Sequence, residues 1–201
     1  MTRATNGART GKPSSRLKRE RPAGFLMRLA GDRRGVSAVE FALIAPLMIA
    51  FYFGLAEFCQ GYMSQKRLAH SASAVADLVA QTDVVTMDEL DDIMSIGALI
   101  MKPYSTSTLT ARVSSVTRDS KGVARVDWSR ATGITPYTPK DVVTVPTDMI
   151  ANGESAVMAE TTYDYASPVK YLMPAVTKFS SVFYERPRRV DKVGCSNCPT
   201  S

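Results

Sequence analysis

Histidine and cysteine are scarce in this sequence of 201 residues, which has one histidine, His70, and three cysteines. A structural zinc site needs about four ligands, mostly of these two types. The cysteines are Cys59 and the pair Cys195 and Cys198, and no second Cys-x-x-Cys is present. A single histidine with no partner is more typical of a solvated surface than of a catalytic base. We therefore expect no metal site and no cofactor.

Catalytic motifs are also missing from the sequence. It contains no phosphate-binding loop, nucleophile motif or paired-carboxylate signature. The acidic run 88–92 is explained by the positive end of a helix dipole, where carboxylates are stabilised. We therefore expect no catalytic residue, and the protein is not expected to be an enzyme.

The Cys195-x-x-Cys198 motif near the end of the chain leaves several interpretations open. In an oxidising compartment the two thiols could close a small disulfide loop. A free or intermolecular pair in an unstructured tail is the main alternative. Redox catalysis is the weakest of the three, because it would need the motif at a helix start after a strand, and here it stands among Gly, Ser, Asn and Pro.

The net charge of +6 is concentrated at the N-terminus. Residues 1–35 hold ten of the 25 Lys and Arg residues but only two of the 19 Asp and Glu residues, so the rest of the chain is slightly acidic. This leader is rich in Ser, Thr, Gly and Pro and lacks hydrophobic periodicity, which predicts disorder. A nucleic-acid-binding arm is disfavoured because a hydrophobic segment follows immediately, and we expect no nucleic-acid partner.

That hydrophobic segment has the length of a membrane span. No charged residue occurs in 41–56, and 36–39 extends the apolar run to about 20 positions, or about 30 Å of helix. Basic residues are concentrated before the span, which places the N-terminus in the cytoplasm and the following chain outside, in a periplasm if the cell has one. Pro46 is expected to loosen the helix locally. The sequence thus predicts a single-pass membrane protein.

The residues beyond the span predict an α+β fold. An apolar stripe at helical spacing carries the first helix on to about residue 81. Thr86 and Glu89 form a capping box for a second helix, which Lys102 and Pro103 end. Period-2 alternation then predicts strands, which we place at 108–116 and 123–128 (a hairpin), at 155–165, and in a last strand or helix-strand combination within 171–184.

The expected fold class is therefore a long N-terminal transmembrane helix extending into an amphipathic helix, then a second helix and a small, mainly antiparallel sheet. The expected divisions are a basic disordered leader (1–35), a transmembrane helix (36–59), a juxtamembrane helix (60–82), a periplasmic α+β domain (83–189) and a flexible tail (190–201). Trp128, Tyr163, Tyr165 and Tyr171 could belong to the core or to a docking face.

The short motif Gly35-Val36-Ser37-Ala38-Val39-Glu40-Phe41 lies where the basic leader meets the apolar run. It resembles the processing site of type IV prepilins, and most closely that of TadE-type pseudopilins of the Tad/Flp pilus. In those families a membrane peptidase cuts after the glycine, and the glutamate at the fifth position of the product stays in the helix. The resemblance therefore implies cleavage between Gly35 and Val36, with Glu40 and Phe41 as assembly residues.

Elementary electrostatics gives Glu40 a use in such a product. Cleavage would create an ammonium group on Val36, and a carboxylate and an ammonium are each costly when unpaired away from water. Between packed helices, the amine of one subunit could neutralise Glu40 of another and fix their axial register. A carboxylate that only reaches the lipid headgroups, with no further role, is the alternative interpretation.

About 140 residues follow the span, which is too many for the very short major Flp pilin and favours a minor pseudopilin that promotes surface adherence. The resemblance implies several partners, which are the lipid membrane, a prepilin peptidase, the inner-membrane pilus assembly platform, and other pseudopilins or the Flp pilin. The alternative is an uncleaved, membrane-anchored periplasmic interaction protein unrelated to pili.

A signal peptide is disfavoured, because the nearest small-x-small site, 72–74, lies far downstream.

Overall fold

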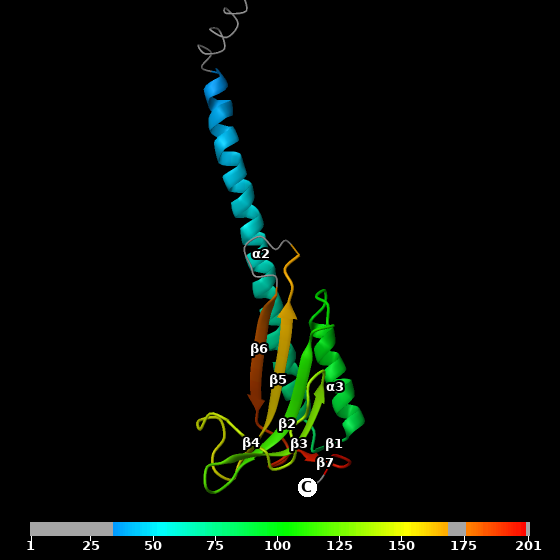
Figure 1. Ribbon diagram of the computed structural model, residues 1–201. Helices are drawn as coiled ribbons and strands as arrows, with labels where there is room; N and C mark the ends of the chain where they lie inside the picture. Colours follow the sequence, from blue (N-terminus) through cyan, green and yellow to red (C-terminus); the bar gives the residue numbers. More distant parts are fainter. Residues whose placement is uncertain (1–33, 169–175, 200–201) are drawn as a thin grey trace, which may run out of the picture. The chain divides into compact units, whose positions relative to one another are not determined.

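The structure is a computed structural model that describes residues 34–168 and 176–199 (Figure 1). Residues 1–33 of the predicted leader and Tyr171 lie outside the described residues. The chain divides into two compact units, residues 1–49 and residues 50–201, which are described separately below. All strands and the second helix belong to the second unit.

The first described helix, α2, extends from Arg34 to Ala80 without interruption and includes Pro46. The sequence predicted one helix over nearly the same residues, and the structure confirms this. Gly54 and Gly61, which could have interrupted the helix, lie inside it and are buried. Glycine has a low helix propensity, so these two positions depend on the length of the helix around them and on their burial.

The second helix, α3, extends from Met87 to Ile100 and begins with the predicted capping box. The backbone amide of Glu89 donates to Thr86 Oγ1 at 3.2 Å, and the Thr86 amide donates to Glu89 Oε2 at 2.8 Å. The guanidinium group of Arg67 on α2 donates to the carbonyls of Ile100 (3.1 Å) and Lys102 (2.6 Å). A cation therefore binds the negative end of α3, as the helix dipole favours.

The strands after α3 form an antiparallel sheet of five, in the order β4-β3-β2-β5-β6. Their bounds are β2 Thr110–Arg118, β3 Ala124–Thr132, β4 Val142–Val143, β5 Ser155–Tyr165 and β6 Thr177–Glu185. The predicted strand 155–165 is confirmed residue for residue, and the predicted hairpin is formed by β2 and β3. The short strand β4 was not predicted.

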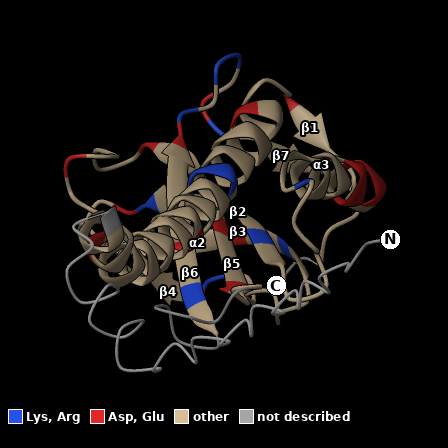
Figure 2. Ribbon diagram, turned by 90° about the horizontal axis from the view of Figure 1, so that it is seen from above, with Lys and Arg blue, Asp and Glu red and all other residues tan. Residues whose placement is uncertain are grey.

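Both faces of this sheet are covered, which explains the burial along β5. Val157 and Ala159 point into a core that α2 and α3 complete with side chains such as Val79 and Leu90. Their neighbours Ala156 and Met158 point into a second core on the other face of the sheet, whose remaining members are Val116, Ala124, Val126, Val143, Val145 and Ile150. Figure 2 shows α3 beside α2, and the red turn at one end of α3 is its acidic start.

The segment expected to be a flexible tail is folded as far as it is described. Strand β7, Gly194–Cys195, pairs in parallel with β1, Val84–Val85. Val193 is fully buried, and its carbonyl accepts a hydrogen bond from Trp128 Nε1 at 2.8 Å. We expected a flexible tail because the residues around the cysteines are mostly polar. The single apolar residue Val193 is enough to hold this segment in the core.

Candidate processing and assembly segment

The apolar segment from Val36 to Phe58 lies on α2 and exposes most of its large side chains. These are Val36, Val39, Phe41, Leu43, Ile44, Leu47, Met48, Ile49, Phe51, Tyr52, Phe53, Leu55 and Phe58. Such an apolar surface is unfavourable in water but matches lipid, and α2 is long and apolar enough to cross a membrane. The helix therefore fits a membrane anchor.

Gly35 lies in the first turn of α2, at a position where the fold would also accommodate a larger residue. A Cβ atom built on this residue would meet no other atom within 4 Å, and the backbone does not need a positive φ. Val36, which follows it, is more than half exposed. Both residues of the proposed scissile bond are thus accessible. The contacts of the described fold do not explain why residue 35 is a glycine.

Glu40 and Phe41 follow on the same exposed part of the helix. Val36 and Glu40 are four residues apart, so they lie on one face of α2 about one turn from each other. Within residues 34–168 and 176–199, no hydrogen bond or ion pair involves Glu40, and Phe41 is exposed. The carboxylate is therefore available to a group from another molecule.

A second carboxylate on α2, Glu57, is fully buried in the second unit, although the sequence had suggested only a polar flank of the span. Ser167, directly after β5, donates a hydrogen bond from its hydroxyl to Glu57 Oε1. Gly54, Gly61 and Ser64 are buried on the same face of α2. The spacing of 3 and 4 residues from Gly54 through Ser64 could have revealed this buried stripe, but sequence reasoning missed it.

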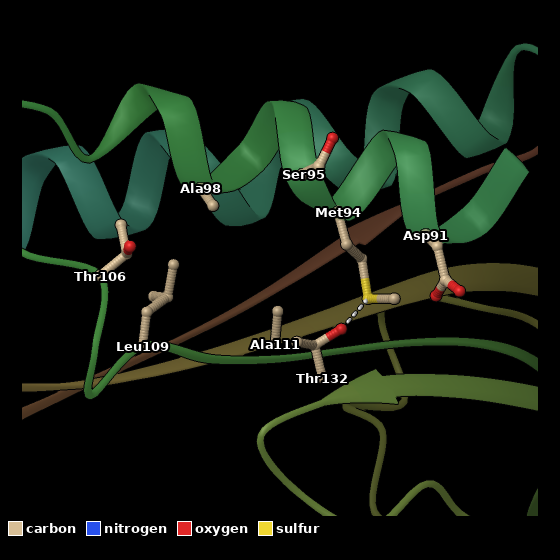
Figure 3. A pocket seen from close by; sticks show the side chains of 8 residues that line it. All are labelled: Asp91, Met94, Ser95, Ala98, Thr106, Leu109, Ala111 and Thr132. Carbon is tan, nitrogen blue, oxygen red and sulfur yellow. Dashed lines mark hydrogen bonds between the residues drawn. The ribbon is translucent and has the colours of Figure 1, made fainter. Parts of the chain in front are cut away.

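One hollow of the folded unit lies between α3 and the start of β2, and Figure 3 shows the side chains that line it. Its volume is about 240 Å³. Asp91 at its rim accepts hydrogen bonds from Arg130 at 2.7 and 2.6 Å, and Thr132 Oγ1 contacts Met94 Sδ at 3.8 Å. The hydrogen bond from Arg130 lowers the pKa of Asp91. Because these polar groups serve internal contacts, the hollow offers little chemistry for a ligand.

The remaining sequence candidates occupy structural positions. His70 is exposed on α2, Trp128 belongs to the core, and Cys59 is exposed and free. Cys195 and Cys198 form a disulfide whose sulfur atoms pack at the edge of the core. Among the described residues, no group of three or more His, Cys, Asp and Glu side chains could hold a metal ion.

Comparison with known proteins identifies only the N-terminal helix. Residues 35–77 match the family described as TadE-like protein, so the resemblance noted in the sequence is confirmed for this segment. No curated protein and no solved structure matches the chain. The match covers most of α2 and ends at Asp77, before α3 and the sheet begin.

Proposed function

From the match of residues 35–77 to the TadE-like family, which links this chain to Tad pilus assembly, we propose that the protein is a minor pseudopilin. It is made as a precursor, inserted in the inner membrane with its leader in the cytoplasm, and cut between Gly35 and Val36. The folded unit then lies in the periplasm. The product joins other pseudopilins or the Flp pilin through α2 and promotes adherence to surfaces.

The observation that carries this proposal is that the matched segment begins at Gly35 and contains the whole exposed apolar face of α2. An exposed glycine that the fold does not require suits the narrow site of a peptidase. Cutting there removes the basic leader and leaves an apolar helix that begins with Val36. Such a helix can leave the lipid only by packing against other apolar helices, which is how a pilin subunit is held.

Glu40 supplies the specificity of that packing. Cutting places an ammonium at the positive end of the helix dipole, which is unfavourable for a cation. A carboxylate can stabilise the ammonium there. An amine of one subunit facing Glu40 of its neighbour would satisfy two buried charges at once. Helices displaced by one turn would lose this contact, so the pair selects a single axial offset.

The deciding experiment expresses the full chain with and without a prepilin peptidase and sequences the N-terminus of the purified protein. We expect a product that begins with Val36 only when the peptidase is present. Gly35→Leu abolishes cutting, whereas Ser37→Leu, two residues further along the same open turn, is the matched control for added bulk and is still cut. An intact leader on the wild-type chain in the presence of active peptidase contradicts the proposal and favours an uncleaved anchor.

A further inference from the structure

The exposed face of α2 carries two aromatic rings and a lysine in one line within the second unit. Phe58 and Tyr62 stack with their ring centroids 6.4 Å apart, and Lys66 Nζ lies 5.3 Å from the centroid of the Tyr62 ring. Phe58 is 63% exposed and Tyr62 is 49% exposed. Since residues three and four apart share a helix face, this face changes from the apolar Phe51 and Leu55 to Tyr62, which has a polar tip, and then to the cationic Lys66.

The opposite face of the same turns is closed by the protein. Glu57, Gly61 and Ser64 are buried there, and Ser167 binds the carboxylate of Glu57. A carboxylate at this level of the helix would be costly if it faced lipid. The folded unit removes that cost by covering Glu57, and the face with Phe58, Tyr62 and Lys66 stays open to an outside partner.

The position of these residues along the helix matches the dimensions of a bilayer. Phe58 lies about 22 residues after Val36, which is about 33 Å of helix, and the hydrocarbon core is about 30 Å thick. Lys66 lies about 12 Å further along, beyond a headgroup layer that is about 5–8 Å thick, so its long side chain has to extend back along the helix for the ammonium to reach the headgroups. If Val36 lies at one boundary of the hydrocarbon, Phe58 therefore lies close to the other boundary, and Tyr62 lies about 6 Å further along, in the headgroup layer.

We propose that Phe58, Tyr62 and Lys66 form an interfacial anchor that binds the phospholipid headgroup layer on the side of the folded unit. Aromatic rings are enriched at this level of membranes, and a lysine above them extends its ammonium to the headgroups. A neighbouring helix would not require a change from apolar to cationic side chains, whereas a bilayer presents that change from its hydrocarbon to its headgroups. The anchor rests on the membrane insertion in the proposed function, but not on cleavage or pilus assembly.

Brominated lipids test this proposal because bromine quenches tryptophan fluorescence at a known depth. The full chain is reconstituted at one copy per nanodisc of phosphatidylethanolamine and phosphatidylglycerol. Tryptophan is introduced singly by Phe58→Trp, Tyr62→Trp, Leu47→Trp or Ile96→Trp. The native Trp128 is 4% exposed and provides the baseline in every sample.

We expect the tryptophans at 58 and 62 to be quenched most by bromine close to the glycerol backbone. Tryptophan at 47, near the middle of the span, is quenched most by bromine at the chain ends. Ile96→Trp, on the exposed part of α3, gives no quenching above the baseline. Quenching at 47 without quenching at 58 and 62 overturns the interfacial anchor and leaves the anchored pseudopilin intact. Absence of quenching at 47 contradicts membrane insertion, and with it both proposals.

Discussion

The hydroxyl of Ser167 donates a hydrogen bond to the carboxylate of Glu57, and 110 residues separate the two in the sequence. Both side chains are buried. The contact joins the chain after β5 to α2. Glu57 lies next to Phe58, the last residue of the exposed apolar segment of α2. Glu57 thus gives α2 a fixed attachment to the folded unit.

Ser167→Ala should lower the free energy of unfolding by about 1–3 kcal/mol, because it removes a hydrogen bond to a buried carboxyl group. Thermal unfolding in detergent, followed by circular dichroism, measures the loss. Ser107→Ala, at an exposed position, is the matched control and should change stability by less than about 0.5 kcal/mol. An unfolding temperature equal to that of the wild type would show that the contact does not stabilise the fold.

Glu40→Ala should leave cutting after Gly35 intact but prevent the product from joining an assembly. The side chain is exposed, so its loss does not disturb the described fold. N-terminal sequencing reports the cut, and co-purification with other pilus proteins reports assembly. Glu40→Asp keeps the charge and should retain part of the assembly. Wild-type assembly of the Ala variant would remove the register role of Glu40.

The ion pair between Asp91 and Arg130 should add a small, pH-dependent contribution to stability. The hydrogen bond from Arg130 lowers the pKa of Asp91 in the folded state. The unfolded chain therefore binds the proton more readily, so the contribution is full above the ordinary pKa of about 4 and is lost as the pH falls through the folded value. Since both side chains are more than a third exposed, its size is about 0.2–1 kcal/mol.

Unfolding temperatures of Asp91→Asn and the wild type, measured from pH 7 down to pH 2.5, test this expectation. The difference between the two proteins should be largest at neutral pH and shrink in acid. Asp92→Asn is the control, because Asp92 has no ion-pair partner among the described residues. A difference that stays constant with pH would mean that the substitution acts through packing instead of charge.

Replacing Cys195 and Cys198 by serine should destabilise the fold by about 2 kcal/mol, the entropy of closing a loop this short. The disulfide also holds Asn197, which lies between the two cysteines, in place. Asn197 Oδ1 accepts a hydrogen bond from the amide of Met87 at 2.8 Å. Reduction of the wild type should lower its unfolding temperature similarly. Cys59→Ser, at the free and exposed cysteine, should have no effect. Equal stability of all forms would show that the disulfide is dispensable.

The sequence by itself determined the elements whose causes are local. The apolar run fixes the exposed part of α2, because lipid-seeking side chains without interruption can form only a long helix. Thr86 and Glu89 fix the start of α3, because the capping box involves only neighbouring residues. Alternation fixed β5 as a strand, and the resemblance indicated by the motif at Gly35 is confirmed by the family match over residues 35–77.

Tertiary structure alone decided which polar and small residues are buried. From the sequence alone, Glu57 looks like the polar end of a membrane span, but in the structure it is buried and accepts a hydrogen bond from Ser167. Val193 looks like part of a tail, but its carbonyl accepts a hydrogen bond from the buried Trp128. Both faces of β5 are buried because separate parts of the chain cover each of them. In each case the stabilising partner lies far away in the sequence, so the burial of the residue depends on contacts that no local pattern encodes.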